Sequence, residues 1–554
     1  MIAFQILVTC AFIAALAAST PTTPVAPNLA TLPVATLIQG RDGLEVTWQS
    51  TTAQALAKAQ YNGSYASLGW DYLHVKAADS VDGYYYGGYT EGYLTAAALN
   101  FTNFGSFACP TAACNAWIDA HIAFMLNSSA VLGPTDLFWD RVGKILAQMR
   151  GIADGYNNAT NATTAFREIF LDNFGNELGD VLTAIGLSNG HHHHRLQRIA
   201  NNQHCSALIK VTHDDIFVSH DTWSGFNALG IRIFKVYEFG SAKVSLDGWP
   251  GQVASGTDWY VTSHELAVQE TTNIVWNTSL YAAVVPETVS EFIRVMVANY
   301  LAASGPEWAA YFSRLNSGTY NNQWMVVDYK LFEPGQPLRD DLLWVAEQIP
   351  GWVMSADVTD VLRRDGYWAS YNINYFRDLY VISGYEAVER EQGTFWSYTK
   401  YARPEIFRRN QTAITAMPDM QRMMRYNDYA RDPFSLIPNC TGADSACKSL
   451  HSSMLTIASR GDLMPVYPTA AQNAEVYGPL YSWVAQGCFG AIDSKISSYK
   501  THQRLSGLAV NGPTNDQQPT FTWGENPNCP SSGRPAGSAA TYDFPWVSFN
   551  PVDI

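Results

Sequence analysis

The sequence has few charged residues, and fewer positive than negative ones. Only 15% of its 554 residues are charged, and 34 Lys and Arg oppose 49 Asp and Glu, for a net charge of −15 at pH 7. No run of Lys and Arg exceeds two residues. Because such a chain repels phosphate backbones and anionic membrane surfaces, we expect no nucleic-acid partner and no electrostatic docking on membranes. Single lipid molecules stay open as substrates.

Long apolar runs are scarce as well. The only one is MIAFQILVTCAFIAALAA at residues 1–18, followed by Ser19, Thr20 and Pro21. A hydrophobic centre before small residues is typical of a secretory signal peptide. A membrane anchor is the alternative, but it would need about 20 apolar residues and a basic flank, which is missing. We therefore expect residues 1–18 to be a signal peptide and the mature chain to have no integral membrane contact.

Several catalytic and metal-binding motifs are missing. No serine has glycine both two places before and two places after it, which excludes the nucleophile elbow of serine hydrolases. P-loop and HExxH motifs are absent. Four consecutive histidines, His191 to His194, cannot all face one ion on a regular element, and no Cys or carboxylate stands beside them. We expect no metal and no cofactor.

Apolar residues, in contrast, are plentiful. They make up 47% of the chain, including 17 Trp, 30 Tyr and 25 Phe, which excludes disorder and predicts a compact globule. Eight N-x-S/T sequons behind a signal peptide indicate a glycosylated, secreted or lysosomal protein, with its acceptor asparagines on the surface. These are Asn62, Asn100, Asn127, Asn158, Asn161, Asn277, Asn410 and Asn439.

The cysteines number eight, and Cys10 lies in the signal peptide, which leaves an odd seven for an oxidising compartment. Six of them form three candidate disulfide pairs by spacing, Cys109–Cys114, Cys440–Cys447 and Cys488–Cys529. Cys205 is left over. Counting alone does not decide whether Cys205 is an inert core residue or a reactive thiol.

The hydrophobic periodicity of the chain is interrupted just before Cys205. Residues 187–204 are polar and lack hydrophobic periodicity, as expected of an exposed linker. The β-rich runs Cys205 to Val211 and Ile216 to His220 then flank a polar turn, which predicts a hairpin. If the turn centres between residues 213 and 215, Cys205 lies opposite residues 222–224. His220 and Trp223 therefore come close to Cys205.

The rest of the chain mixes strands with long helices, which predicts an α+β layered domain. The apolar stripe in Pro286 to Leu301 predicts a helix, as do the patterns in Ala116 to Met125 and Phe138 to Met149. The last stretch of about 50 residues is rich in Pro, Gly and Asn and is expected to wrap the surface as irregular chain. Five further strands are predicted at Lys243 to Leu246, Trp259 to Thr262, Thr271 to Trp276, Trp324 to Tyr329 and Leu342 to Gln348.

A cysteine that opens a strand directly after a linker suggests self-cleavage. Its thiol would attack the carbonyl of His204, the peptide would shift to a thioester, and water would release the upstream piece. Cys205 would then carry a free α-amine with a reference pKa of about 7.7 to 8.0, which can serve as base for its own thiol. A nearby donor would have to stabilise the oxyanion.

The sequence resembles the phospholipase B-like family, a branch of the N-terminal nucleophile (Ntn) hydrolases. The resemblance covers most of the chain from about residue 70. It rests on GYTEGYLT (88–95), CSALIKVTHDDIFVSHDTW (205–223), QETTN (269–273), NSGTYNNQWMVVDYK (316–330), EQIPGWV (347–353), GYWASYNINYF (366–376), ARPEIFRRNQ (402–411) and MMRYNDYARDPFSL (423–436). The resemblance implies a four-layer αββα sandwich that matures by self-cleavage before a cysteine.

The resemblance also implies roles for single residues. Cys205 matches the nucleophile and new N-terminus, Asn372 the donor to the oxyanion, and Arg403 a basic residue of the site. His220 and Trp223 match positions that line the pocket, although the family does not always have His at the first, and Thr272 matches a residue near the cysteine. Purely structural roles compete for these side chains: core packing for Trp223, a strand neighbour for Thr272, a buried amide for Asn372 and an ion pair for Arg403.

Together these points predict a precursor that is cut between His204 and Cys205. Residues 19–204 would stay as a non-covalent partner of the catalytic chain 205–554, both forming one αββα unit. The predicted reaction hydrolyses an acyl amide or ester through a thioester on Cys205. The family name implies deacylation of phospholipids, whereas related Ntn enzymes chiefly hydrolyse amides. The alternative is a non-catalytic secreted lipid- or glycan-binding glycoprotein.

Overall fold

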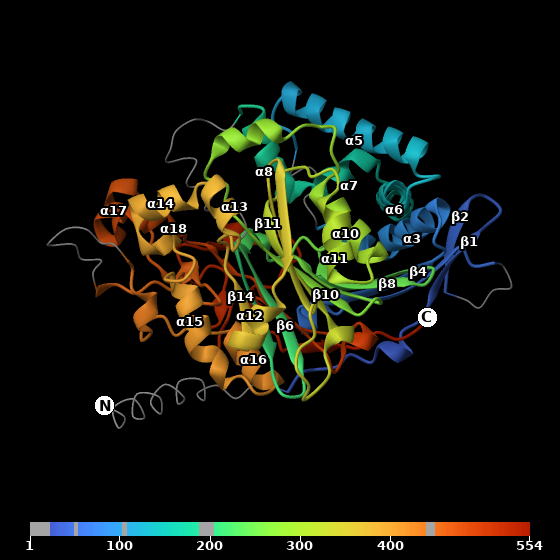
Figure 1. Cartoon of the computed structure of the whole chain (residues 1–554). Coiled ribbons are helices and arrows are strands. Elements are labelled where there is room, and N and C mark those ends of the chain that lie inside the picture. Colours follow the sequence, from blue (N-terminus) through green and yellow to red (C-terminus); the bar gives the residue numbers. More distant parts are fainter. Residues whose placement is uncertain (1–22, 49–53, 102–107, 188–203, 439–448) are drawn as a thin grey trace.

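The computed structural model describes residues 23–48, 54–101, 108–187, 204–438 and 449–554. They form a mixed α+β fold with two large sheets, which confirms the predicted class (Figure 1). The larger sheet has eleven strands, in the spatial order β13 (Trp352–Asp357), β12 (Leu343–Ile349), β11 (Asn322–Asp328), β10 (Leu266–Thr272), β9 (Trp259–Thr262), β8 (Ala242–Gly248), β7 (Ile233–Phe239), β4 (Asp71–Ala77), β3 (Ala57–Asn62), β1 (Ala35–Gln39) and β2 (Leu44–Thr47).

The second sheet has seven strands and contains the predicted hairpin. Its order is β14 (Tyr367–Ser370), β5 (His204–Val211), β6 (Ile216–Gly225), β16 (Asp493–Ser498), β17 (Gly507–Asn511) and β20 (Val547–Phe549), and β15 (Phe489–Ala491) also pairs with β6. A separate pair is formed by β18 (Phe521–Thr522) and β19 (Thr541–Tyr542). Within the hairpin, Cys205 pairs with Thr222 and Ala207 with His220, so the predicted register is confirmed.

One group of helices packs on the larger sheet. Its core joins Ile118, Ile145 and Val297 to Val75, Tyr237 and Val326 on the strands. The helices that contribute buried residues to it are α3 (Val81–Leu94), α4 (Ala96–Leu99), α5 (Ala112–Leu132), α6 (Leu137–Thr160), α7 (Phe166–Asn173), α8 (Gly175–Ala184), α10 (Glu291–Leu301) and α11 (Gly305–Ser313). The predicted helices at 116–125 and 138–149 lie inside α5 and α6, and the third begins only at Glu291.

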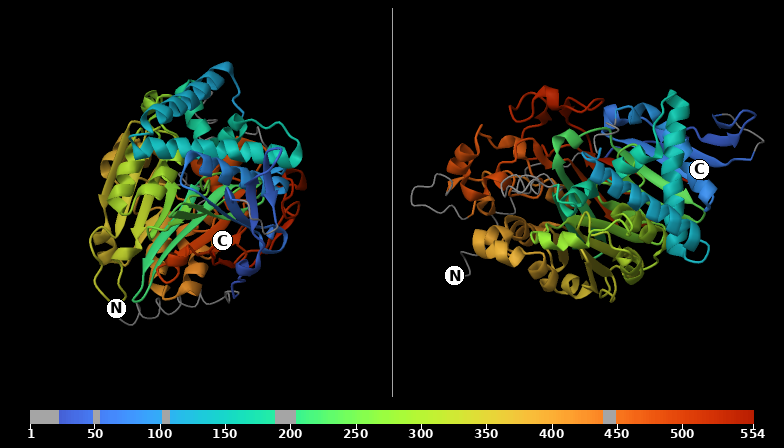
Figure 2. Two further views of the ribbon diagram at one scale, coloured as in Figure 1. Left: turned by 90° about the vertical axis from the view of Figure 1, so that its right-hand side faces the viewer. Right: turned by 90° about the horizontal axis from the view of Figure 1, so that it is seen from above.

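A second group of helices packs on the smaller sheet, through Leu208, Phe217 and Ile496 of its strands. The group is α13 (Arg377–Ile382), α14 (Tyr385–Gln392), α15 (Ala402–Asn410), α16 (Met417–Met424), α17 (Ala470–Tyr477) and α18 (Tyr481–Val484). The short helices α2 (Tyr65–Leu68) and α12 (Thr359–Asp365) lie outside both groups. Figures 1 and 2 show α5 and α6 on one side of the molecule and α14 to α18 on the other, with strands between them.

The two sheets also contact each other directly. One cluster joins Ile209 and Val218 of the hairpin to Met325 and Val345 of the larger sheet. Since side chains alternate along a strand, Cys205 shares the face of Ala207 and Ile209 and points between the sheets. The nucleophile candidate is therefore the second residue of β5 and lies between the two sheets.

The end of the chain differs from the prediction. Residues after about 505 contribute β17 and β20 to the smaller sheet, so they are not merely irregular surface chain. The composition did not predict these strands because both are short and lie among Gly and Pro residues. Gly507 itself has a packing reason, since a Cβ there would lie 2.7 Å from the rings of Phe234 and Trp259.

The predicted strand at Thr271 to Trp276 is also misplaced. The strand β10 ends at Thr272, and beyond it the backbone of Ile274 donates to the hydroxyl of Tyr385 in α14. The other predicted strands match β8, β9, β11 and β12 to within a few residues. After Thr272 the chain bonds to a side chain of a distant helix, and the periodicity of the sequence does not predict such a contact.

Residues on either side of the linker share one sheet. Strand β4 pairs in parallel with β7, from Asp71 opposite Ile233 to Ala77 opposite Phe239. Strands β1 to β4 precede the linker, whereas β7 to β13 follow it. The two parts of the chain therefore complete a common sheet and a common core.

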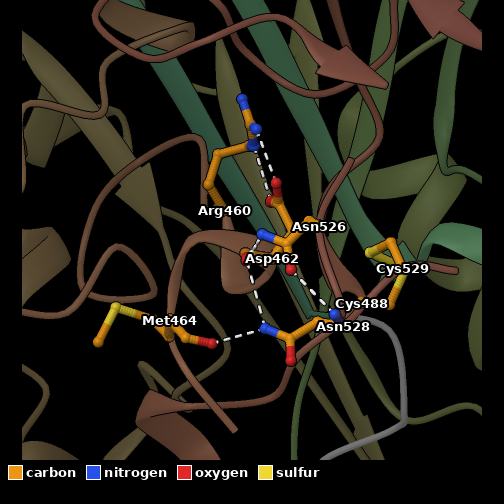
Figure 3. The surroundings of a disulfide bond; sticks show 7 residues. All are labelled: Arg460, Asp462, Met464, Cys488, Asn526, Asn528 and Cys529. Carbon is orange, nitrogen blue, oxygen red and sulfur yellow. Dashed lines mark hydrogen bonds and ion pairs between the residues drawn. A yellow bond between two sulfur atoms is a disulfide. The ribbon is translucent and has the colours of Figure 1, made fainter. Parts of the chain in front are cut away.

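Two of the three predicted disulfides are formed, Cys109–Cys114 and Cys488–Cys529, and Cys205 is free and buried. Cys440 and Cys447 lie outside the described residues. Figure 3 shows how side chains support the second disulfide: Asn526 and Asn528 both donate to the carbonyl of Asp462, which pairs with Arg460. The loop that contains Cys529 is thus held by these hydrogen bonds as well as by the disulfide.

Most predicted glycan acceptors are accessible, but one is not. Asn100, Asn127, Asn158, Asn161 and Asn277 are exposed and Asn62 is partly exposed. Asn410 is only 8% exposed at the end of α15, so its predicted surface position is wrong, because α15 packs that turn against the core. Asn439, the signal peptide at 1–18 and His191 to His194 fall outside the described residues. Within the described ranges, no helix is both long and apolar enough to cross a membrane.

Candidate active site

Cys205 is fully buried as the second residue of β5. Burial raises the pKa of its thiol far above the usual value, and the charge of Asp258 raises it further. A hydrogen bond from the backbone N–H of Trp223 acts in the opposite direction. In the uncut chain the thiol is therefore neutral, and its chemistry depends on the groups around it.

Asn372 links three parts of the site. Its side-chain oxygen accepts hydrogen bonds from the backbone N–H of Cys205 at 3.2 Å and from Arg403 at 2.8 Å. Its Nδ2 donates to the carbonyl oxygen of Thr272 at 2.8 Å. The backbone of Asn372 is left-handed, with φ of 71°, a conformation that costs free energy in a residue other than glycine. The site holds this strained residue with its amide oxygen against the backbone nitrogen of Cys205.

Arg403 brings a buried cation to the same backbone. It lies in the first turn of α15 and is 3% exposed, and its Nη1 donates to the carbonyl oxygen of Cys205 at 2.5 Å. Its guanidinium carbon lies 4.4 Å from the ring centre of Trp223. In the part of the chain that the structure describes, Arg403 donates to carbonyl, amide and hydroxyl oxygens and forms no ion pair. This guanidinium thus keeps its positive charge available to an anion formed at Cys205.

Trp223 supports that arginine. It pairs with His204 across the hairpin, so its ring lies on the face of the sheet opposite the side chain of Cys205. Its Nε1 donates to the carbonyl of Ile457 at 3.1 Å. The ring is also part of a small cavity of about 30 Å³, lined mainly by aromatic side chains together with Asn372 and Arg403.

Thr272 and His220 occupy less central positions. The carbonyl of Thr272 accepts the bond from Asn372, while its buried hydroxyl has no partner among the described residues. His220 shares the face of Cys205, two residue pairs further along the hairpin, opposite Ala207. Burial, and then the charge of Lys495, hold the pKa of His220 well below its usual value, so the ring is neutral. The structure thus brings the other five predicted residues around Cys205, with His220 the least direct.

Sequence reasoning missed a carboxyl group beside the thiol. The hydroxyl of Tyr320 donates to Asp258 at 2.6 Å and to Glu270 at 3.1 Å. Burial raises the pKa of Asp258 to about 6 and that of Glu270 well above its usual value. Both Asp258 and Tyr320 have positive φ, of 61° and 48°. Tyr320 belongs to the quoted YNNQWM string, whereas Asp258 follows a Gly- and Ser-containing loop that carries no signal in the sequence.

A large cavity of about 950 Å³ opens beside Asp258. Asp258 and Tyr320 are part of its wall, and so are Ser224 and Gly225, which directly follow Trp223 on β6. Gln486 lines both this cavity and the small aromatic one. Among the described residues, no group of three or more His, Cys, Asp or Glu side chains is arranged to hold a metal ion.

Fold and site together define a mixed α+β protein built around a buried free thiol, with an amide and a guanidinium on its backbone. The family model for phospholipase B matches residues 57–549. The chain belongs to the phospholipase B family.

Relatives of known name agree with this assignment. Phospholipase B-like protein B from Dictyostelium discoideum is 32% identical over 550 residues, covering 94% of this chain and 90% of the relative. Phospholipase B-like protein C from the same organism is 32% identical, with 93% and 90% covered. Putative phospholipase B-like 2 from Mus musculus is 35% identical over 436 residues, covering 74% of this chain and 69% of the relative.

Proposed function

We propose that this protein is a phospholipase B-like hydrolase of the Ntn type, in which the two sheets and their helices form a four-layer αββα sandwich. The observation that carries the proposal is the placement of Cys205. The residue is free, lies second in β5 after a polar linker, and has Asn372 at its backbone nitrogen and Arg403 at its carbonyl. An N-terminal nucleophile needs its amine positioned beside its own thiol and a donor near the reacting carbonyl, and these contacts supply groups for both.

Self-cleavage would begin with attack of the Cys205 sulfur on the carbonyl carbon of His204. The new carbon–sulfur bond replaces the peptide carbon–nitrogen bond, and the thiol proton goes to the departing amine. Water then hydrolyses the thioester and frees the carboxylate of His204 and the thiol. The amine of Cys205 stays at the side-chain oxygen of Asn372, which already accepts its backbone N–H.

In the mature enzyme, the free amine would act as base for the thiol of the same residue. A base so close offsets the unfavourable burial of the thiol, whose pKa is raised in the uncut chain. Asn372 has a second Nδ2 hydrogen besides the one given to Thr272, and this would serve the oxyanion together with the charge of Arg403. Trp223 would hold the guanidinium in place from the other face.

The substrate would be an acyl amide or ester. The relatives carry the name phospholipase B-like, which favours removal of an acyl chain from a phospholipid. We propose that residues 19–204 remain bound after cleavage, because β1 to β4 complete the sheet of β7 to β13. Two disulfides fit an oxidising, secreted or lysosomal location, where the exposed sequons would carry glycans.

The test begins with intact mass and denaturing electrophoresis of the purified protein. We expect two chains, the larger beginning CSALIK, and a single chain for Cys205→Ala. Ser219→Ala is the matched control, since Ser219 is also buried in the hairpin but donates to the carbonyl of Leu208, away from Cys205 and Arg403, and should leave cleavage intact. An uncut wild-type chain would overturn the mechanism.

A panel of acyl amides and esters at acidic and neutral pH then tests turnover. We expect hydrolysis by the cleaved wild type and none by Cys205→Ala. Cleavage without any turnover would instead favour a non-catalytic glycoprotein that binds lipids or glycans.

A further inference from the structure

The wall of the large cavity carries more acidic side chains than nearby basic side chains neutralise. The charged side chains that line it are Asp172, Glu177, Asp258, Glu291 and, at its exposed rim, Arg534. Four carboxyl groups therefore face one cavity that has a single basic side chain in its lining.

The cations behind this wall are largely engaged elsewhere. Lys235, which acts on Asp172, is 2.7 Å from Glu91. Lys495, which acts on Asp258, is 3.0 Å from Asp493. Only Arg294, beside Glu177 and Glu291, forms no ion pair among the described residues. The wall thus keeps an excess of carboxyl groups.

One oxygen atom in the wall points to a ligand. Glu177 is 1% exposed, and its Oε2 accepts bonds from the backbone of Glu291 and from the hydroxyl of Thr319. Its other oxygen, Oε1, is buried without any hydrogen-bond partner in the described chain. A buried carboxylate oxygen without a donor is costly, and a donor from a ligand in the cavity would remove that cost.

The cavity also passes near the nucleophile. Asp258 acts electrostatically on the thiol of Cys205, and Tyr320 bridges Asp258 and Glu270 at the same place. Ser224 and Gly225 extend the wall along the end of β6, next to the residue that pairs with His204. Cys205 itself is buried and not part of the cavity wall, so a molecule in the cavity would lie against the carboxyl groups on the side of the wall nearest Cys205.

We propose that this cavity binds a positively charged, ammonium-bearing part of the substrate, which is recognised by Glu177, Glu291 and Asp258. An ammonium has three donors for carboxylate oxygens and no acceptor that needs a partner. A free carboxylate or phosphate in the same place would be repelled by the four carboxyl groups when they are ionised. The inference rests on the proposed function only in taking Cys205 as the reacting residue; the binding of cations can be tested without it.

The test uses three amides of one fatty acid whose amine parts differ only in charge. The amides of diaminobutane, pentylamine and aminobutyrate end in an ammonium, a methyl group and a carboxylate at nearly equal length. With purified wild-type protein at pH 7, we expect kcat/KM to fall at least about tenfold from the first to the second and further to the third. Titration calorimetry with the same amides gives the order of Kd independently of turnover.

Variants locate the effect. Glu177→Gln keeps an oxygen for the bonds from Glu291 and Thr319 but removes the charge, and Glu291→Gln is the second variant in case the first does not fold. We expect each to lower the preference for the ammonium over the methyl amide severalfold, with the methyl amide little changed. Asp360→Asn removes the same charge at a side chain that is 91% exposed and should change nothing.

The outcomes are distinct. Equal affinity of the wild type for the ammonium and methyl amides, or an unchanged preference in both Gln variants, would overturn the inference. If no amide is hydrolysed while the order of Kd holds, the proposed hydrolysis fails and the cation site stands. If the amides are hydrolysed in the opposite order, the hydrolysis stands and the cation site fails.

Discussion

Two groups of residues meet at Cys205 and differ in how their charge is compensated. The arginine side consists of Arg403, Asn372 and Trp223, and the carboxyl side consists of Asp258, Glu270 and Tyr320. Arg403 is a buried cation held by neutral oxygens and an aromatic ring. On the carboxyl side, burial and neighbouring charges raise the pKa of both acids.

The comparison shows how one buried thiol can have two different environments. The arginine side favours negative charge on the atoms of Cys205, whereas Asp258 disfavours it. A cation near the backbone of the nucleophile suits an oxyanion. Buried carboxyl groups whose ionised form is disfavoured are stabilised by a ligand that supplies positive charge, because a nearby cation favours ionisation. The arginine side therefore suits the reacting carbonyl of a bound substrate, and the carboxyl side suits a positively charged part of it.

The largest effect is expected from removing the arginine charge. Arg403→Met should slow self-cleavage and any turnover about 100-fold or more, because the oxyanion would lose its charged neighbour. Tm should fall as well, since Met leaves the carbonyl oxygens of Cys205 and Tyr371 without their donor, so rates are compared at a temperature where the variant is folded. Electrophoresis over time and kcat measure the effect. Arg408→Met, an exposed arginine of the same helix, is the control. Fast cleavage in Arg403→Met would show that the arginine side is structural only.

Two variants of Asn372 separate the role of its side-chain amide from the strain of its backbone. Asn372→Gly suits a φ of 71° but removes the side chain, so cleavage should slow about tenfold or more while Tm falls little. Asn372→Ala loses the same amide and keeps the strain, and its Tm should fall further. Thermal unfolding and the cleavage rate are measured for both variants. Equal cleavage in the wild type and Asn372→Gly would remove Asn372 from the mechanism.

The arginine side was predictable from the sequence, whereas the carboxyl side was not. Cys205 stood out because it was the unpaired cysteine after a linker, and Asn372 and Arg403 came from strings that match a family. The hairpin register followed from alternation and turn length alone. Asp258 sits after an irregular loop, and it reaches Cys205 only because β9 and the hairpin meet across the two sheets. Contacts of that kind depend on tertiary packing that local patterns do not encode.

The same reason explains the errors in the fold. The strand β17 begins at a Gly and is followed directly by Gly512 and Pro513, and its pairing with β16 and β20 makes it a strand. Asn410 looks like any other sequon, but the packing of α15 buries it. Local composition predicted the elements with strong periodicity, such as α6, and missed those whose conformation is set by their partners.

The carboxyl groups should make stability depend on pH. Burial raises the pKa of Asp172 and of Glu177 to about 7 and that of Asp258 to about 6. A raised folded pKa adds stability that is complete below the unfolded value, near pH 4, and is lost as pH rises through the folded value. We expect the free energy of unfolding to fall by at least about 1.4 kcal/mol between pH 4.5 and 7.5, the equivalent of one unit of pKa for one group.

Urea unfolding at a series of pH values measures this slope. Glu177→Gln should flatten it, since the amide does not titrate, while Asp360→Asn should leave it unchanged. Stability that rises from pH 4.5 to 7.5 in the wild type would contradict the raised pKa values of the cavity wall.

The smallest effect is expected from Tyr320→Phe, which tests how the carboxyl side is held together. The variant removes the hydroxyl that donates to both Asp258 and Glu270 but keeps the ring. Without that donor, the ionised form of Asp258 loses a hydrogen bond, so the pKa of Asp258 should rise further. The midpoint of the pH dependence of stability should therefore move upward by a fraction of a unit, with cleavage at Cys205 unchanged. A downward movement would mean that repulsion between Asp258 and Glu270, rather than the bond from Tyr320, sets the proton affinity on this side of the thiol.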